Sequence, residues 1–527
     1  MHSLFHLCSW LPYFPALVSG LLLTLCFPDP GLHYLAFAAL CPLIISLQHM
    51  TVRQSFLAGF AAGFVHFTTL IYWIVPTLST YGGLHILLSV SALTLLCVYL
   101  GLYPALFACA LKKLDPSPAI MPLAGACLWT GLEFVRAHLF TGFPWGILGY
   151  SQFSDRLLVQ MADVTGVLGI SFVLVLCNTL ISTVWIQITS GSSPAGRHLF
   201  LRIYLCVSYT FFILAAAYVY GILRIPRVTQ QMAAAPKPVF AVVQGNIRQD
   251  MKWSRAFRRT TIEKYGNMSL DAARFTPDLI IWPETALPFY YGHDLDLSNQ
   301  VDQYVRRAKT HFLMGSPAVE TSGDPVRYFN RVFMLNQLSI PVGTYDKTHL
   351  VPFGEYIPFQ DLLFFLEKLT QQAGNFSKGE TEFVPLAFKD HKTGVLICFE
   401  ILFPSISRQF VRNRADILTT VTNDAWFGRT SAPAQHFSIA VLRAVENRRS
   451  VVRAANTGIS GFIDPTGRVF SATRLFTDAV IVHSLPALNR LSFYTRYGDL
   501  LSFACLIAIS MGFMVKGTEY IKRRFQP

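Results

Sequence analysis

The sequence predicts a chain of two parts, an α-helical transmembrane bundle of about eight spans and an α/β domain. Of its 527 residues 52% are hydrophobic and 14% charged, whereas soluble domains carry about 25% charged residues. Residues 1–223 hold only 12 charged side chains, and the remaining 304 residues hold 61. After residue 238, short β-branched runs replace the long apolar ones. This pattern excludes disorder, a collagen-like repeat and a single water-soluble globule.

Eight apolar stretches have the length that a membrane span requires. A bilayer core about 30 Å thick needs about 20 mostly apolar helical residues. The first stretch has no Lys or Arg before it and no clear cleavage site, so we expect a retained span rather than a signal peptide. The stretches lie near 10–27, 30–48, 56–77, 84–111, 117–138, 158–188, 199–222 and 499–515.

Basic residues in the short loops predict the orientation, because they tend to remain in the cytoplasm. With a cytoplasmic N-terminus the outer loops collect only Arg156. Both termini are then inside, and residues 224–495 lie outside the cytoplasm. The net charge of +13 fits this topology and attraction to anionic lipid, and we expect no nucleic-acid partner because no basic helical stripe is visible. The inner set is Arg53, Lys112, Lys113, Arg197, Arg202, Lys516, Lys522, Arg523 and Arg524.

Strand-like and helix-like runs alternate from residue 238, as in layered α/β domains. We expect a transmembrane domain over 1–223, a linker over 224–237, an extracytoplasmic catalytic domain over 238–485, a linker over 486–498, a last span over 499–515 and a basic tail over 516–527. Helices are expected near 254–274, 298–309, 404–413 and 433–447. The expected strands are Val239–Val243, Leu279–Trp282, Phe312–Gly315, Val332–Leu335, Val395–Cys398, Ile417–Val421 and Val451–Ala454.

Cys398 is the only one of ten cysteines outside the apolar spans and their flanks. It cannot form a disulfide within its domain, so it is either a packing residue or a reactive thiol. The run from Thr393 predicts a buried strand that delivers Cys398 to a turn before a helix at Pro404. Nucleophiles are often presented at such turns, where backbone N–H groups can bind an oxyanion.

Two other strand ends could activate this thiol, which at a pKa of about 8.5 needs a base or a positive field. Glu284 follows the apolar run Ile280–Trp282. The segment after Tyr345 offers the Lys347 amine, the His349 imidazole and the Glu355 carboxylate.

Glu284, Lys347 and Cys398, 63 and then 51 residues apart, resemble the catalytic triad of the nitrilase superfamily. The resemblance covers roughly 238–485 and includes Arg443–Asn447 and Asn456–Ser460. It implies a four-layer α-β-β-α sandwich in which Glu284 is the general base, Lys347 stabilises the oxyanion and Cys398 is the nucleophile. These residue types suit those tasks, since a carboxylate can accept the thiol proton and an ammonium can stabilise an oxyanion.

The spans around this domain, with the motifs Thr422–Gly428 and Gly142–Gly146, resemble the apolipoprotein N-acyltransferase family along nearly the whole chain. The resemblance implies an enzyme of the bacterial inner membrane, active on its periplasmic side and without a cofactor. An acyl chain would pass from a phospholipid to the Cys398 thiol and then to the N-terminal α-amine of a diacylglyceryl-modified apolipoprotein. Phe399 stands where Tyr is common in that family, and the aromatic ring is kept.

Several further residues have both a functional and a structural interpretation. Glu355 is expected to position Lys347 or to be a solvated carboxylate, and Glu400 to orient the site or to pair with an Arg. His349 and His436 are expected to be structural. Trp253 is either near the acyl site or a core aromatic. Apolar residues after the catalytic motifs are expected to contact lipid and exclude water from the thioester, namely Phe359, Trp426 and Phe427.

Charged residues inside the spans are costly and often functional. Arg136 either neutralises Glu133, three residues away on one helix face, or binds a lipid phosphate, and no role is assigned to Asp163. No metal is expected, since the Cys and His spacing lacks a zinc pattern.

Two other functions remain open from the sequence. One is a membrane-anchored nitrilase or amidase that hydrolyses small C–N bonds, and the other is a transporter or sensor with an inactive nitrilase fold. The sequence specifies neither the lipid headgroup and acyl position nor the oligomeric state.

Overall fold

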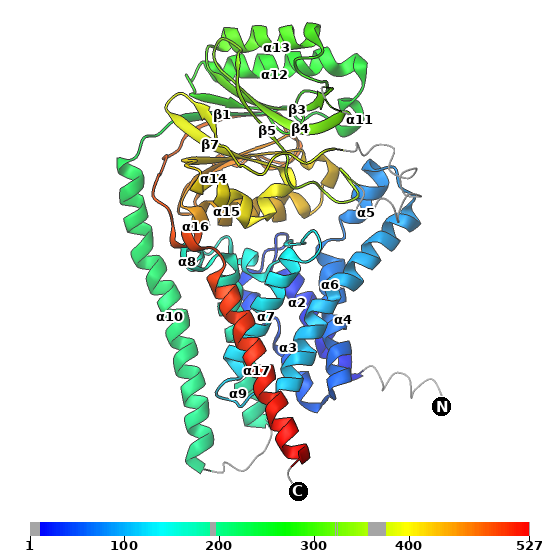
Figure 1. Ribbon diagram of the computed structural model, residues 1–527, viewed down its shortest axis with the longest axis vertical. Helices are drawn as coiled ribbons and strands as arrows, with labels where there is room; N and C mark the ends of the chain where they lie inside the picture. Colours follow the sequence, from blue (N-terminus) through cyan, green and yellow to red (C-terminus); the bar gives the residue numbers. More distant parts are fainter. Residues whose placement is uncertain (1–10, 190–195, 322, 324, 357–375, 526–527) are drawn as a thin grey trace. The chain divides into compact units, whose positions relative to one another are not determined.

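The computed structural model describes residues 11–189, 196–321, 323, 325–356 and 376–525. These residues form two compact units (Figure 1). The described residues of 1–72, 90–224 and 497–527 make up the first unit, and those of 73–89 and 225–496 make up the second.

The first unit is helical. Among the described residues, four helices are long and apolar enough to cross a membrane, and a fifth counts if Val52–Leu70 and Ile74–Tyr81 are one broken span. The stretches expected near 10–27 and 30–48 form the shorter apolar helices Phe14–Leu25 and His33–His49. The main helices are α2 (Phe14–Leu25), α3 (Cys41–Ser46), α4 (Val52–Leu70), α6 (Ile86–Leu114), α7 (Met121–His138), α9 (Val167–Thr189), α10 (Gly196–Ala234) and α17 (Leu500–Phe525).

Two six-stranded sheets form the centre of the second unit. Helices α12 (Arg258–Ala273) and α13 (Leu295–Ala308) cover one sheet, and α14 (Pro404–Arg412) and α15 (Ala432–Asn447) cover the other, which gives four layers (Figure 1). The first sheet has the order β12 (Ala479–Ser484), β1 (Val239–Gln244), β2 (Leu279–Ile281), β3 (His311–Glu320), β4 (Arg327–Leu335) and β5 (Pro341–Asp346). The second has the order β11 (Val469–Phe470), β10 (Gly461–Ile463), β9 (Ser450–Ala455), β8 (Ile417–Thr422), β7 (His391–Ile397) and β6 (Leu386–Phe388).

All seven strands and all four helices expected in the α/β domain are present, with ends shifted by a few residues. Strands β5, β6, β10, β11 and β12 were not expected, because their runs are short or mix polar and apolar residues. Within the sheets β1, β2 and β3 are parallel, as are β7, β8 and β9. Because parallel strands end at one edge of their sheet, the residues that follow β7 and β8 are gathered there.

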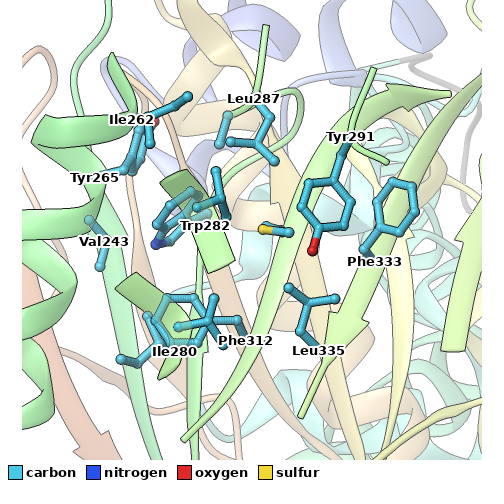
Figure 2. Close-up of a cluster of buried hydrophobic side chains, with 14 of the residues drawn as sticks. Val243, Ile262, Tyr265, Ile280, Trp282, Leu287, Tyr291, Phe312, Phe333 and Leu335 are labelled. Carbon is cyan, nitrogen blue, oxygen red and sulfur yellow. The ribbon is translucent and has the colours of Figure 1, made fainter. Parts of the chain in front are cut away.

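A buried aromatic cluster fixes the end of β2 (Figure 2). Trp282, the residue after β2, is fully buried, and its ring centroid lies 5.0 Å from that of Tyr265 and 5.8 Å from that of Phe312. Its indole N–H donates a hydrogen bond of 2.8 Å to Ser269 Oγ on α12. The chain two residues further on, at Glu284, therefore starts from a rigid position.

The segment 73–89 belongs to the second unit although its sequence is apolar like the spans around it. The Trp73 ring packs edge-on against Phe427, with centroids 4.9 Å apart, and its Nε1 donates to Gln435 Oε1 at 3.4 Å. The transmembrane domain expected over 1–223 had included this segment. It packs beside the short helix Asp424–Phe427 that follows β8.

Candidate active site

Cys398 stands at the end of β7, where the strand turns into the short helix Cys398–Leu402. Its φ of 52° is in the left-handed region, which is strained for a residue other than glycine. Burial raises the pKa of the thiol, and the negative charge of Glu284 raises it further, while Lys347 opposes the shift. The resting thiol is therefore protonated near neutral pH and needs a base to become a nucleophile.

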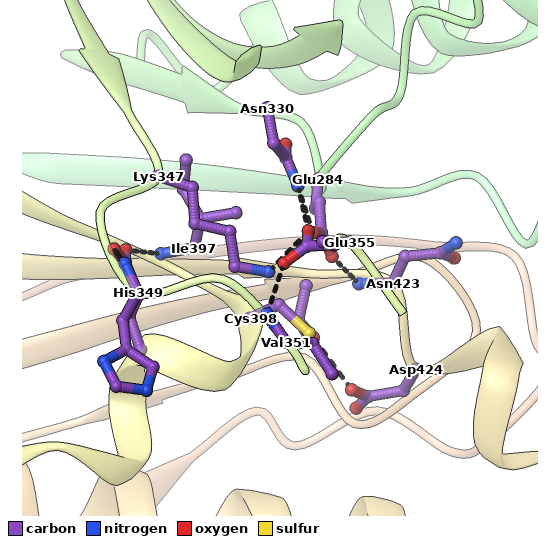
Figure 3. Close-up of polar contacts among 12 residues, drawn as sticks. Glu284, Asn330, Lys347, His349, Val351, Glu355, Ile397, Cys398, Asn423 and Asp424 are labelled. Carbon is purple, nitrogen blue, oxygen red and sulfur yellow. Dashed lines mark hydrogen bonds and ion pairs between the residues drawn. The ribbon is translucent and has the colours of Figure 1, made fainter. Parts of the chain in front are cut away.

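Glu284 provides a carboxylate directed into the site (Figure 3). Its Oε2 accepts a hydrogen bond of 2.8 Å from the Asn423 backbone N–H, and its Oε1 accepts one of 2.8 Å from Asn330 Nδ2. The turn at Glu284 packs closely on Gly315 of β3, where a Cβ would lie 2.9 Å from the Glu284 Cα. The carboxylate is thus held by β4 and by the residue that follows β8.

Lys347, directly after β5, is 1% exposed and lies between two carboxylates. Its Nζ is 2.9 Å from Glu355 Oε1 and 3.7 Å from Glu284 Oε1. Burial lowers the pKa of the amine, but the charges of Glu355 and Glu284 overcome that effect and raise it above its ordinary value. Lys347 is therefore a permanent cation beside the nucleophile, as an oxyanion requires.

Glu355 completes this charge network. Its Oε1 accepts hydrogen bonds from Lys347 and, at 3.1 Å, from Asn330 Nδ2, and its Oε2 accepts one of 2.8 Å from the Val351 N–H. Asn330 therefore bridges Glu284 and Glu355. The contacts support the expectation that Glu355 positions Lys347, rather than being a solvated carboxylate.

Glu400 links the Lys347 loop to the nucleophile strand. Its fully buried carboxylate accepts five hydrogen bonds and pairs with no arginine in the part of the chain described. Burial raises the pKa of Glu400, and these hydrogen bonds oppose the shift. The donors are Tyr345 Oη, the Thr348 N–H and Oγ1, the His349 N–H and the Ile397 N–H, at 2.7 to 3.1 Å.

A second buried network lies behind the nucleophile. Asp424 Oδ2 accepts from Arg453 Nη2 at 2.8 Å, and its Oδ1 is 3.0 Å from His436 Nδ1. His436 Nε2 lies 3.2 Å from the Cys398 carbonyl oxygen, which can only accept, so Nε2 is the donor. Burial and the charge of Arg453 lower the pKa of His436, and the charge of Asp424 opposes the shift. His436 is therefore structural, as expected, and it holds the strained backbone of Cys398.

Comparisons with known proteins agree with this geometry. Residues 19–180 match the family model of the apolipoprotein N-acyltransferase N-terminal domain, and residues 240–489 match that of the carbon-nitrogen hydrolases. The chain is 40% identical over 495 residues to the apolipoprotein N-acyltransferase of Geobacter metallireducens. The matched residues make up 94% of this chain and 93% of the relative. The chain belongs to the apolipoprotein N-acyltransferase family. Its second unit has the nitrilase-like fold expected from the sequence.

Other relatives and solved structures match as well. The apolipoprotein N-acyltransferase of Chlorobaculum tepidum is 32% identical, covering 94% of each chain, and that of Photobacterium profundum is 31% identical, covering 92% of this chain and 91% of the relative. The crystal structure of a carbon-nitrogen hydrolase from Helicobacter pylori G27 has 14% identity and a TM-score of 0.37, and it covers 50% of this chain and 95% of its own.

The remaining candidate residues lie outside the triad. The His349 imidazole points away from Cys398 (Figure 3) and packs on Phe403, with centroids 3.7 Å apart. Burial lowers its pKa to about 4, so a structural role is supported. The Phe399 ring lies edge-on to Phe403 at 5.4 Å. Trp253 is 49% exposed, which excludes the core interpretation.

The aromatic residues expected to contact lipid are only partly described. Trp426 and Phe427 are half-buried, and Phe427 packs on Trp73. Phe359 lies outside the described residues, as do the apolar residues 362–366.

Arg136 and Asp163 have structural partners within the first unit. The Arg136 guanidinium is buried and donates to the backbone carbonyls of Phe143, Trp145 and Gly146 at 2.6 to 3.2 Å. It lies 3.9 Å from Glu133 Oε1. Arg136 therefore holds the Gly142–Gly146 motif, and these contacts do not support phosphate binding. Asp163 accepts from Tyr220 Oη and Arg224 Nε, both at 2.7 Å.

Sequence reasoning missed Asn330, Asn423 and Lys252. The two asparagines had a usable signal, because Asn330 interrupts an apolar strand and Asn423 follows another. Lys252, 3% exposed, donates to the Glu284 carbonyl oxygen at 3.3 Å. No signal in the sequence pointed to this role, since the neighbours of Lys252 in the sequence are polar. Among the described residues no group of three or more His, Cys, Asp or Glu side chains could hold a metal ion.

Proposed function

We propose that this protein transfers an acyl chain from a membrane phospholipid to the N-terminal α-amine of the diacylglyceryl-cysteine of an apolipoprotein, the last step of bacterial lipoprotein maturation. Glu284 accepts the Cys398 proton, and the thiolate attacks the ester carbonyl carbon of the donor. Lys347 stabilises the oxyanion. The C–O bond breaks, Glu284 returns the proton to the departing lysophospholipid hydroxyl, and an acyl thioester remains on Cys398.

In the second half-reaction the acceptor amine attacks the thioester carbonyl. The C–N bond forms, the C–S bond breaks and Cys398 recovers a proton through Glu284. The two bulky lipid substrates then occupy one site in turn, which divides a difficult transfer into two steps.

One observation carries this proposal. Glu284, Lys347 and Cys398 come from three separate strand ends and meet in one buried charge network, in a chain that is 40% identical to a named apolipoprotein N-acyltransferase. The network contains the base, the cation and the nucleophile of a thioester mechanism.

Intact-protein mass spectrometry tests the proposal. Purified protein incubated with phospholipid should gain the mass of one acyl chain, and the added mass should be released by a diacylglyceryl-modified peptide. Cys398→Ala should gain nothing, and Glu284→Gln and Lys347→Met should gain it at least about 100-fold more slowly. Continued transfer by Cys398→Ala would refute the mechanism, and ammonia release from small amides without lipid would favour the amidase alternative.

We also propose the finer topology expected from the basic loops, with eight spans in the bacterial inner membrane, both termini cytoplasmic and the catalytic domain periplasmic. The uneven distribution of Lys and Arg supports it. In this arrangement the domains follow the boundaries 1–223, 238–485 and 499–515, apart from segment 73–89. A membrane-impermeant thiol reagent should label single cysteines placed at Lys392 in intact spheroplasts but not at Lys113.

Trp253, Trp426, Phe427 and Phe359 are proposed to contact the acyl chains. The support is that Trp426, Phe427 and Phe359 are apolar residues close after the catalytic motifs in the sequence, and that Trp253 directly follows the buried Lys252. Replacing Trp253 with Ala should raise the KM for phospholipid more than it lowers kcat.

A further inference from the structure

Lys252 is a second buried amine in the active site, and neither the triad nor Glu355 accounts for it. It ends the helical turn α11 (Gln249–Lys252) and is 3% exposed. An ammonium carries three N–H donors, yet in the described part of the chain the only hydrogen-bond acceptor of Lys252 is the Glu284 carbonyl oxygen, at 3.3 Å.

The turn that carries Lys252 is tied to the residues that hold the catalytic base. The Ile247 N–H donates to Asn456 Oδ1, and Asn456 Nδ2 donates back to the Ile247 carbonyl, both at 2.8 Å. Gln249 Oε1 accepts from Asn423 Nδ2 at 2.9 Å, and the Asn423 N–H bonds Glu284. The amine is therefore held at this position rather than left there by a mobile surface side chain.

The two active-site lysines differ in charge compensation. Lys347 has a carboxylate oxygen at 2.9 Å and another at 3.7 Å, so it stays an ammonium. No carboxylate lies within ion-pair distance of Lys252 among the described residues. Burial lowers the pKa of Lys252 to about 8, against the opposing charge of Glu284. Asp250, on the same turn, is exposed and pairs with Arg248. Lys252 can therefore exchange a proton near neutral pH.

The proposed function creates a need for such a group. An α-amine has a pKa of about 7.7–8.0, so the acceptor is mostly an ammonium near pH 7. It must lose one proton to become a nucleophile and a second when the amide forms. Glu284 can accept one of these and return it to the Cys398 thiolate, which leaves the other without an acceptor in the triad.

We propose that Lys252 is a second catalytic base, which takes the first proton from the acceptor α-ammonium. The ammonium N–H bond breaks, the Lys252 amine becomes an ammonium, and the freed amine attacks the thioester carbonyl. Glu284 receives the second proton and passes it to the thiolate of Cys398, and Lys252 later releases its proton to water. This inference rests on the proposed function and concerns only its second half-reaction.

Separating the half-reactions of the full chain in detergent tests the inference. The acyl-enzyme is formed with phospholipid, freed of donor and mixed rapidly with a diacylglyceryl peptide near pH 7 and pH 9. Lys252→Met should form the thioester within about twofold of the normal rate. Its aminolysis should fall about tenfold near pH 7, where about a tenth of the α-amine is already neutral, and recover to within about threefold near pH 9.

Two comparisons separate a base from a structural cation. Lys252→Arg keeps the charge and a donor for the Glu284 carbonyl but cannot lose its proton, so it should show the same defect as Lys252→Met. Hydroxylamine, which is uncharged near pH 7, should cleave the thioester of both variants at the normal rate. Lys392→Met, at an exposed position, is the matched control and should behave as the unaltered enzyme.

Normal aminolysis by Lys252→Met near pH 7, rescue by Arg, or equal losses in both half-reactions would each overturn the inference. If Lys252→Met forms no thioester, Lys252→Gln replaces it, because glutamine retains a donor for the Glu284 carbonyl. Lys252→Gln must then show slower aminolysis near pH 7 than near pH 9, and an equal defect at both pH values would refute the inference. No thioester on the unaltered enzyme would overturn the proposed function itself, which is a different result from any of these.

Discussion

Replacing Asp424 with Asn should destabilise the second unit strongly. Asp424 and Arg453 are both fully buried, with 2.8 Å between Oδ2 and Nη2. The Asn side chain would leave the guanidinium charge without its carboxylate, and breaking a buried pair in this way costs about 3–5 kcal/mol. At about 2–4 °C per kcal/mol for a unit of this size, the melting temperature of the full-length protein in detergent should fall by about 6–20 °C, as followed by tryptophan fluorescence.

The same substitution should change the response to acid. Burial raises the pKa of Asp424, but the charges of Arg453 and His436 overcome this and lower it to about 2 from 3.8. A carboxyl with a lowered folded pKa contributes stability above its unfolded pKa and loses it as the pH falls from about 4 to about 2. At about 1.36 kcal/mol per unit the contribution is about 2–3 kcal/mol. The melting temperature of Asp424→Asn should therefore vary less over this range.

The double variant Asp424→Asn/Arg453→Met is the control, because it removes both charges. It should be more stable than Asp424→Asn, since replacing a whole buried pair costs less than breaking it. A loss of less than about 2 °C in the single variant, or no recovery in the double variant, would refute the reasoning.

Three further substitutions give distinct outcomes. Glu400→Gln turns an amide N–H₂ toward a backbone N–H donor beside the nucleophile and should lower the free energy of unfolding by about 1–3 kcal/mol. The melting temperature should fall and thioester formation should slow, and an unchanged enzyme would contradict this. Glu355→Gln removes the charge 2.9 Å from Lys347 and should slow thioester formation about 10- to 100-fold with folding retained. An unaltered rate of thioester formation would show that Glu355 does not act on Lys347. Gly458→Ala would place a Cβ 2.2 Å from Asp424 Oδ2 and should cost about 1–3 kcal/mol, which an unchanged melting temperature would exclude.

The sequence was most informative where a regular pattern and a chemical group coincide. The expected strands ending near Trp282 and Cys398 are present, because uninterrupted β-branched runs predict buried parallel strands. Glu284, Lys347 and Cys398 could be identified because each directly follows such a strand or matches a family motif in the right order.

Other features depend on tertiary contacts that no local pattern contains. Strand β5 has a Pro and a Gly in six residues, half of which are exposed, and pairing with β4 rather than propensity makes it a strand. Asn330 and Lys252 acquire their roles only when β4 and α11 are brought to Glu284. The charge on Lys252 indicated an exposed position rather than a buried one, since a lysine is almost never fully buried.

The membership of segment 73–89 in the second unit has a practical consequence for anyone who wishes to study the catalytic part alone. A chain cut to residues 225–496 would contain every catalytic side chain but would lack Trp73. It would therefore lose the ring contact between Trp73 and Phe427 and the hydrogen bond from Trp73 to Gln435. Gln435 and His436 are neighbours, and His436 contacts the nucleophile. The catalytic unit is therefore discontinuous in sequence, and a soluble excised version would have to carry residues 73–89 on an engineered connection.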